Sequence, residues 1–182
     1  NRVVAGYDAI NDAVIAKGIN SDISANGHGT KVAGLIGAEA DNDVGFCGMA
    51  GKYPLELIPV RVLGEDGKGK IADVVRGIYW AIDNGADILN MSFGANMSYY
   101  PTALANAIRD ARRQNVFSIC AGGNDTGYNS STTYSGFYPA DLQDAYPVLA
   151  GYYMSANIQS FSYCAKYSDV PGYDYVGHDG SG

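Results

Sequence analysis

Strand-like apolar runs alternate with helical patterns through the middle of the chain. Segment 55–63 (LELIPVRVL) is rich in branched apolar residues and predicts a strand, and 64–70 (GEDGKGK) predicts a glycine-rich turn. Apolar residues then recur at helical spacing from Ile71 to Ile82, and Gly85 predicts the end of that helix.

The alternation continues in the second half of the chain. Segments 87–93 (DILNMSF) and 116–121 (VFSICA) predict strands on either side of a helix that begins near Pro101, and further strands are predicted over 146–152 and 158–164. Strand–helix–strand order with short connections implies parallel strands joined by right-handed crossovers. We therefore expect an α/β fold in a single domain over residues 1–182, with a doubly wound, mostly parallel sheet and helices on both of its faces.

Composition narrows the classes of function. The 182 residues are 47% hydrophobic, which suits a globular core, and they carry a net charge of −7. An acidic chain argues against a nucleic-acid partner, which would need a basic surface. No apolar run approaches the roughly 18–20 residues of a membrane-spanning helix, so we expect no membrane span.

The three cysteines include no CxxC pair and predict no zinc site. Cys120 lies in an apolar run and is expected to be a small core residue.

Two polar strand tips are candidates for function. Segments 90–96 (NMSFGAN) and 121–127 (AGGNDTG) each lead an apolar strand into glycine and a polar amide or hydroxyl. Ligands of a doubly wound sheet bind at the carboxyl ends of its strands. Glycine lets another backbone approach closely, and asparagine can donate hydrogen bonds. From this pattern alone, two ordinary strand-to-loop turns are the alternative.

A histidine motif completes a resemblance to a known family. In 26–34 (NGHGTKVAG), His28 lies between two glycines at the head of an apolar run. This motif resembles the histidine motif of the subtilisin-like serine proteases (subtilases). Segment 86–94 (ADILNMSFG) resembles their substrate-binding strand, and 121–125 (AGGND) resembles their oxyanion-asparagine motif. The three motifs occur in the family's order and span most of the chain.

The resemblance implies a subtilisin-like fold and a serine endopeptidase, whose Ser-His-Asp triad hydrolyses peptide bonds in a protein or peptide substrate. His28 would be the general base, and Asn124 would donate its side-chain amide to the oxyanion. The remaining substrate-binding positions implied are Ser92, Phe93 and Gly94, which would pair with the substrate backbone, Gly67 and Gly69, which would flank it from the other side, and Ala121, Gly122 and Gly123, which would line the pocket for the residue before the scissile bond.

Some details of that pocket also follow from the resemblance. Phe137 stands where the family's simplest members have glycine at the back of the pocket, so a shallow pocket for small or medium side chains is expected. Glu65, Asp66 and Asp125 would make the rim acidic and favour basic residues further along the substrate. The Tyr138–Pro139 bond resembles a position where the family has a cis peptide bond.

Two triad members have no match in the sequence. Segment 3–12 resembles the stretch just after the family's aspartate strand, which makes Asp8 and Asp12 poor substitutes, and 176–182 (VGHDGSG) ends where the serine motif would begin. We expect a partial domain that starts after the aspartate strand and ends before the serine helix. Such a chain would be inactive alone, with uncovered apolar surface for self-association or for pairing with the missing segments. His178, Asp179 and Ser181 are not expected to form a triad, because triad residues converge from distant segments.

Other classes of function remain to be weighed. A non-catalytic pseudoprotease or peptide-binding module of the same fold would keep the strand tips without the serine, so the residue at the serine position separates it from a protease. A nucleotide-binding domain is disfavoured, because neither 37–45 (GAEADNDVG) nor 64–70 matches GxGxxG or GxxxxGK[ST].

The family resemblance raises two further expectations. The chemistry needs no cofactor, but a structural calcium ion is expected in the loop after the histidine helix, where Asp41 and Asp43 offer hard oxygen ligands. A solvated acidic turn is the alternative. The protein is expected to be secreted or displayed on the cell surface. Acceptor patterns for N-glycosylation at Asn90 and Asn124 favour a bacterial host, because glycans there would obstruct the cleft.

Overall fold

The chain divides into two compact units, unit 1 (residues 1–86) and unit 2 (residues 87–182). The computed structural model describes residues 2–19, 21–123, 136–148, 151–154 and 157–160. None of the described helices combines the length and the apolar character that crossing a membrane requires.

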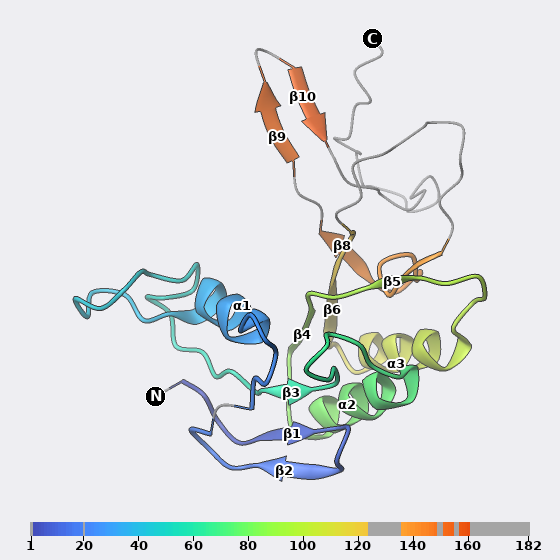
Figure 1. Cartoon of the computed structure of the whole chain (residues 1–182), viewed down its shortest axis with the longest axis horizontal. Helices are drawn as coiled ribbons and strands as arrows, with labels where there is room; N and C mark the ends of the chain where they lie inside the picture. The colour runs from blue at the N-terminus through green and yellow to red at the C-terminus, as the bar shows by residue number, and fades with distance from the viewer. Residues whose placement is uncertain (1, 20, 124–135, 149–150, 155–156, 161–182) are drawn as a thin grey trace. The chain divides into compact units, whose positions relative to one another are not determined.

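Unit 1 contains a three-stranded sheet in the order β2-β1-β3 (Figure 1). Strand β1 (Gly6–Asp8) pairs antiparallel with β2 (Ala13–Ile15) and parallel with β3 (Val60–Arg61). The strand predicted over 55–63 is therefore shorter than expected, although Leu57 adds one parallel bridge to Val3. The hairpin at the start of the chain was not predicted.

Helix α2 (Ile71–Asp83) confirms the helix predicted from the apolar spacing and packs against β1 and β3. The chain leaves the helix through Gly85, whose φ of 81° lies in the left-handed region that glycine adopts without strain. The contact is close at Gly77, where a Cβ atom would lie 2.7 Å from Val62 Cγ1 and 2.9 Å from Val60 Cγ1. The absence of a side chain at Gly77 therefore allows the helix to approach the strand.

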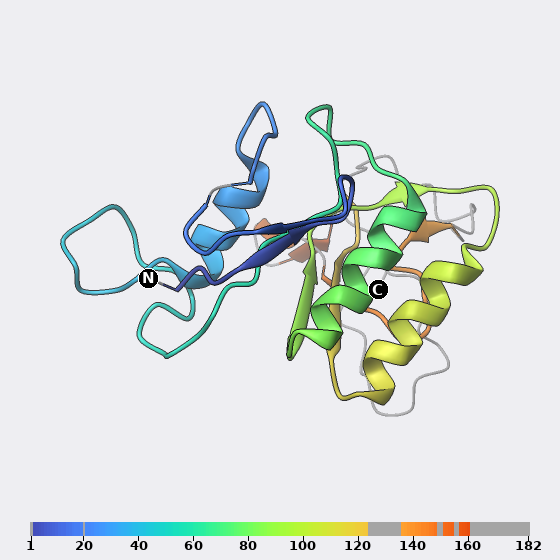
Figure 2. The same ribbon diagram turned by 90° about the horizontal axis from the view of Figure 1, so that it is seen from below.

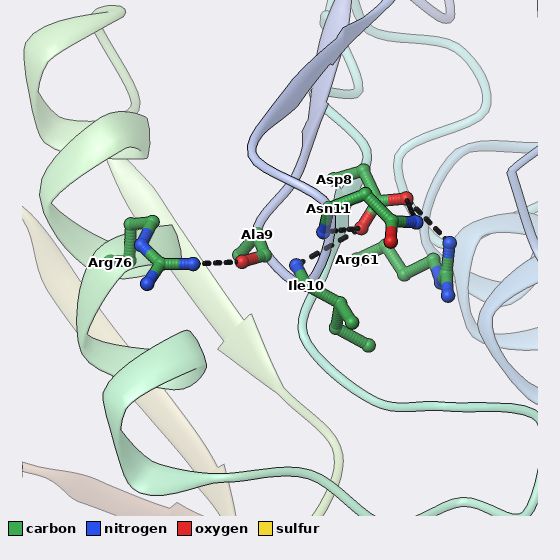
Figure 3. A network of polar contacts seen from close by, with 6 residues as sticks. All are labelled: Asp8, Ala9, Ile10, Asn11, Arg61 and Arg76. Atoms are coloured by element: carbon green, nitrogen blue, oxygen red, sulfur yellow. Dashed lines mark hydrogen bonds and ion pairs between the residues drawn. The ribbon is translucent and has the colours of Figure 1, made fainter.

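A polar network lies at the end of β1 (Figure 3). The carboxylate of Asp8 accepts hydrogen bonds from Ile10 N at 3.0 Å, Asn11 N at 3.1 Å and Asn11 Nδ2 at 2.8 Å, and it pairs with Arg61 Nη1 at 2.5 Å. Arg76 of α2 donates to the carbonyl oxygen of Ala9. Burial favours the protonated acid, but the bonds from Asn11 and the charge of Arg61 outweigh it and lower the pKa of Asp8. Asp8 thus holds the turn between β1 and β2.

Unit 2 is built on a parallel sheet in the order β4-β6-β8. Strands β4 (Ile88–Met91), β6 (Phe117–Ala121) and β8 (Tyr146–Val148) pair in register, and Met91 lies opposite Cys120. Helix α3 (Thr102–Arg113) packs against β6, as Figure 2 shows. These elements confirm the predicted strand–helix–strand order and its parallel pairing.

Smaller elements complete unit 2. Strands β5 (Ala95–Asn96) and β7 (Phe137–Tyr138) form an antiparallel pair that was not predicted. Strands β9 (Gly151–Met154) and β10 (Asn157–Ser160) pair antiparallel. The strand predicted over 146–152 corresponds to β8 and the start of β9, and β10 overlaps the one predicted over 158–164. The core of the unit includes Ile108 and Ala111, both at 0% exposure, and Cys120 at 1%. Burial raises the pKa of the Cys120 thiol to about 12, in keeping with the predicted core residue.

Substitution of Gly77 by alanine tests the close contact between α2 and β3. Alanine has the higher helix propensity, by about 1 kcal/mol. The clash with Val60 and Val62 should nevertheless dominate, because overpacking a core costs roughly 1–3 kcal/mol. We expect Gly77→Ala to lower the free energy of unfolding in chemical denaturation. Ala72→Gly, at an exposed position of the same helix, measures the propensity effect alone. A stabilised Gly77→Ala variant would show that the strand yields to the added methyl group.

Candidate active site

The candidate site residues fall in both units. His28, Gly67 and Gly69 belong to unit 1, and Ser92, Phe93, Gly94, Ala121, Gly122, Gly123 and Phe137 belong to unit 2. Asn124, the predicted oxyanion donor, lies outside the described residues, as do residues 161–182. Each unit contributes a group with its own local geometry.

His28 is the first residue of helix α1 (His28–Gly37), which confirms the predicted helix start. Gly27 precedes it with φ 62°, a left-handed conformation that glycine adopts without strain. The carbonyl oxygen of Gly27 accepts the first helical hydrogen bond, from Lys31 N at 3.0 Å. Glycine has no side chain with which to cap the free N–H groups of the first turn. The exposed His28 side chain therefore stands on a helix end that needs its cap from elsewhere.

Asp22 and Ser24 provide that cap. Thr30 N and Thr30 Oγ1 both donate to Asp22 Oδ2 at 2.7 Å. The backbone N of His28 donates to Ser24 Oγ at 3.0 Å. Ser24 itself donates to Asp22 Oδ1, from its backbone N at 3.1 Å and from its hydroxyl. One carboxylate thus anchors the first turn of α1 directly through Thr30 and indirectly through Ser24.

These bonds stabilise the ionised form of Asp22. The hydrogen bond from the Ser24 hydroxyl, followed by those from Thr30, holds the pKa of Asp22 well below its usual range. Asp22 was not predicted from the sequence, because a capping side chain is normally adjacent to the first turn. Asp22 lies eight residues before Thr30. The signal available in the sequence was an Asp-x-Ser pair shortly before a helix that is preceded by glycine.

The glycine-rich turn of unit 1 is closed by its own backbone. Gly64 N donates to the carbonyl oxygen of Lys68 at 2.8 Å, and Lys68 N donates to Asp66 Oδ1 at 3.1 Å. Gly67 has φ 73°. A Cβ atom at Gly69 would clash with the carbonyl oxygen of Val62 and lie 2.7 Å from Leu63 Cδ2. Gly67 thus provides the positive φ of the turn, and Gly69 leaves room for the neighbouring atoms of Val62 and Leu63.

The parallel register of unit 2 brings the two predicted strand tips together. Because Met91 lies opposite Cys120, Ser92–Gly94 and Ala121–Gly123 continue from neighbouring strands at the same edge of the sheet. Asn90 Nδ2 donates to Ser92 Oγ at 2.8 Å on one tip. Gly122 N donates to the carbonyl oxygen of Val148 at 2.8 Å on the other. The tips are therefore ordered backbone segments that each carry glycine at one edge of the sheet.

The ring of Phe137 lies between the glycines of these tips. A Cβ atom at Gly94 would clash with the ring, at 2.6 Å from Phe137 Cζ, and would lie 3.1 Å from the carbonyl oxygen of Tyr138. A Cβ atom at Gly123 would lie 3.4 Å from the same Cζ. The phenyl ring therefore fills the space that a bare glycine at position 137 would leave open between the tips.

The backbone around Phe137 is held in place. Asp141 Oδ2 accepts hydrogen bonds from Gly136 N at 2.6 Å and Phe137 N at 2.9 Å, and Asp141 N donates to the carbonyl oxygen of Phe137 at 2.9 Å. Phe137 also pairs with Asn96 across β5 and β7. The Tyr138–Pro139 bond is cis, as predicted.

The acidic loop of unit 1 does not gather its carboxylates. Asp41 pairs with Lys52 at 3.3 Å, and Asn42 Oδ1 accepts from Val44 N at 3.1 Å. Among the described residues, no group of three or more His, Cys, Asp or Glu side chains is placed to hold a metal ion. The geometry gives no support to the calcium site predicted at Asp41 and Asp43.

A polar hollow of unit 2 is unrelated to the predicted site. Its volume is about 430 Å³, and it is lined by Arg109, Arg112, Arg113, Gln143 and Asp144. Asp144 pairs with Arg112 at 3.0 Å and with Arg109 at 3.6 Å. None of the strand-tip residues lines it.

Comparison with known proteins agrees with the motifs. The Subtilase family model matches residues 6–172. A thermophilic serine proteinase of Bacillus sp. (strain AK1) is 33% identical over 177 residues, which cover 96% of this chain and 40% of that protein. An extracellular protease of Xanthomonas campestris pv. campestris is 32% identical in an alignment that covers 81% of this chain and 30% of that protein.

A solved structure shows the same relationship. Fervidolysin from Fervidobacterium pennivorans, described as a keratinolytic enzyme related to subtilisin, matches with a TM-score of 0.71 and 28% identity. The match covers 89% of this chain and 24% of fervidolysin. The chain belongs to the subtilase family, and it spans less than half the length of these relatives.

Acid should remove the stabilisation by Asp22 in a defined range of pH. Its contribution is complete above the pKa of an aspartate in an unfolded chain, about 3.9, and is lost as the pH falls through the lower pKa of the folded state. We expect wild type to melt above Asp22→Asn by a constant margin down to about pH 4, and this margin should shrink at lower pH. Thermal unfolding of both proteins checks this. A margin that stays constant at lower pH would contradict the role of the ionised carboxylate.

Proposed function

We propose that this chain is the central part of a serine endopeptidase that cleaves peptide bonds with a Ser-His-Asp triad. The observation that carries the proposal is the glycine-bearing pair of strand tips, Ser92–Gly94 and Ala121–Gly123, aligned at one sheet edge in a chain of the subtilase family. An extended peptide can add to such a tip by backbone hydrogen bonds, with its side chain directed at the neighbouring glycines. Gly67 and Gly69 flank the substrate on its other side.

His28 acts as the general base of this reaction. Its imidazole takes the proton of the serine hydroxyl as the hydroxyl attacks the scissile carbonyl, and it returns that proton to the leaving amine. The side-chain amide of Asn124 donates to the oxyanion that forms. The serine and the aspartate come from other parts of the protein, so residues 1–182 alone are inactive. The match to named proteinases favours this activity over a pseudoprotease or a peptide-binding module.

A serine-reactive probe tests the activity directly. A fluorophosphonate should label the full-length protein, and His28→Ala should reduce labelling and peptide hydrolysis by about 10⁴-fold or more, because the serine loses its base. Residues 1–182 alone should not be labelled. His178→Ala is the matched control and should retain full labelling, since His178 has no part in the proposed triad. An unlabelled wild type, or equal losses in both variants, would contradict the assignment.

Phe137 limits the side chain that fits before the scissile bond. Its ring already occupies the space between Gly94 and Gly123, and Asp141 fixes the backbone that carries it. Ala121, Gly122 and Gly123 form the wall beside it. Small side chains such as alanine fit beside the ring, whereas a second aromatic ring would have to displace it. The acidic side chains of Glu65, Asp66 and Asp125 favour basic residues elsewhere in the substrate.

Shortening Phe137 should change which peptides are cleaved. We expect Phe137→Ala to raise kcat/KM for Phe or Tyr before the scissile bond, relative to Ala, by at least about tenfold, because a hydrophobic pocket discriminates size on this scale. Cleavage of a peptide library by the full-length protein measures the change. Phe117→Ala is the control, because Phe117 is half exposed and packs against Tyr146. A wild type that already prefers Phe or Tyr would refute the shallow pocket.

The surroundings of the enzyme follow from its relatives. Secretion by a bacterium is supported by the extracellular protease of Xanthomonas campestris, and display at the cell surface is the alternative. Self-association or pairing with further segments of the protein is supported by exposed apolar side chains of unit 1, among them Leu35 at 62% and Met49 at 92%. A structural calcium ion at Asp41 and Asp43 stays a prediction.

A further inference from the structure

We infer that Asp22 is a positioning residue for His28, acting through the first turn of α1. This inference rests on the proposed function, because it assigns Asp22 the task of holding the general base in its reactive orientation. Asp22 has no place in the triad and none in the substrate-binding strands. Its two carboxylate oxygens instead hold the two segments on either side of the histidine.

The need for an external anchor arises from the glycines that frame His28. Gly27 adopts φ 62° and cannot cap the helix, and Gly29 adds no side chain to the first turn. Glycines give the backbone more freedom than any other residue, so a histidine between two of them is poorly fixed by its neighbours. A general base must lie within hydrogen-bond reach of the group that it deprotonates. Freedom of the backbone at this position therefore reduces the fraction of molecules that are ready to react.

The hydrogen bonds of Asp22 remove that freedom from both sides. Oδ2 holds Thr30, two residues after the histidine, through both its backbone N and its hydroxyl at 2.7 Å. Oδ1 holds Ser24, whose Oγ accepts from the backbone N of His28 at 3.0 Å. Asp22 is thus connected to His28 in two ways. On one side, Asp22 binds Ser24 and Ser24 binds the backbone N of His28. On the other side, Asp22 binds Thr30, which is linked to His28 through Gly29.

Only an ionised carboxylate can accept the hydrogen bonds of both Ser24 and Thr30. Each oxygen accepts from two donors, which together are four bonds. The amide of asparagine presents one accepting oxygen and one donating nitrogen, so it can accept on a single side. A negative charge at the first turn also interacts favourably with the positive end of the helix dipole. Asparagine should therefore replace the anchor in part, and alanine should not replace it at all.

The predicted signature is a loss of turnover with little change in substrate binding. The strand tips proposed to bind the peptide are residues of unit 2, whereas the hydrogen bonds of Asp22 given above hold residues of unit 1. A displacement of a reacting group by about 1 Å can reduce the rate roughly 100-fold. In the full-length protein, we expect Asp22→Ala to lower kcat at least about tenfold and to change KM less than about twofold. Asp22→Asn should recover part of kcat.

A matched control separates positioning from general stability. Asp73 lies in the first turn of α2 and pairs with Arg76 at 3.4 Å. Asp73→Ala therefore removes a first-turn aspartate from another helix of the same unit and should leave kcat unchanged. Hydrogen exchange provides a readout that does not need activity, because the amides of His28 and Thr30 should exchange faster in both Asp22 variants than in Asp73→Ala.

The outcomes distinguish this inference from the proposed function. Loss of kcat in Asp22→Ala with partial recovery in Asp22→Asn supports positioning, and so does faster exchange at His28 and Thr30. If the wild type is labelled by the fluorophosphonate but the Asp22 variants turn over normally, the positioning role is wrong and the protease stands. A lower melting temperature with unchanged kcat also overturns it. If Asp22→Ala does not fold, the comparison of Asp22→Asn with wild type decides in the same way.

Discussion

The parallel pairing of β4 with β6 is the constraint on which the proposed substrate-binding half of the site depends. Residues in register on parallel strands leave the sheet at the same edge, so Met91 opposite Cys120 places Ser92–Gly94 beside Ala121–Gly123. A slip of one residue would turn every side chain of β6 to the other face and bury the exposed ones. Leu89, Met91 and Cys120 resist such a slip, because each is buried at 9% exposure or less. The core of the unit therefore also sets the geometry of its edge.

Glycine has a different task at each place in this molecule. At Gly77 it lets a helix approach a strand, and at Gly27 it supplies a left-handed turn before helix α1. Gly94 and Gly123 leave room for the ring of Phe137. A glycine has no side chain that could form hydrogen bonds or pack at its position, so residues elsewhere provide these contacts. Asp22 does so for Gly27, and Asp141 does so for the backbone that carries Phe137.

Much of this arrangement could be predicted from sequence, and the remainder depends on contacts between distant residues. The spacing of apolar residues predicted α2 and α3 closely, because a helix of that length needs a continuous buried face. Strand bounds were less accurate, since β3 is two residues long where nine were expected. The pair β5 and β7 was missed because its paired residues are 41 and 43 positions apart and neither segment shows an alternating pattern. Motif resemblance predicted a role for His28, but it gave no reason to select Asp22, whose contacts with the first turn of α1 are visible only in the structure.

Phe137 and the strand tips are held by different parts of unit 2, so the depth of the proposed pocket and the alignment of the peptide backbone depend on different elements. The ring is carried by a short antiparallel pair and an aspartate anchor, while the strand tips belong to the parallel sheet. A shorter side chain at position 137 would therefore deepen the proposed pocket while leaving the β4–β6 register and helix α1 in place. During evolution, single substitutions at this position can change the substrate specificity of such an enzyme while its catalytic residues stay the same. The antiparallel pair of β5 and β7 is therefore the part of unit 2 in which a substitution changes the proposed specificity at least cost to the rest of the site.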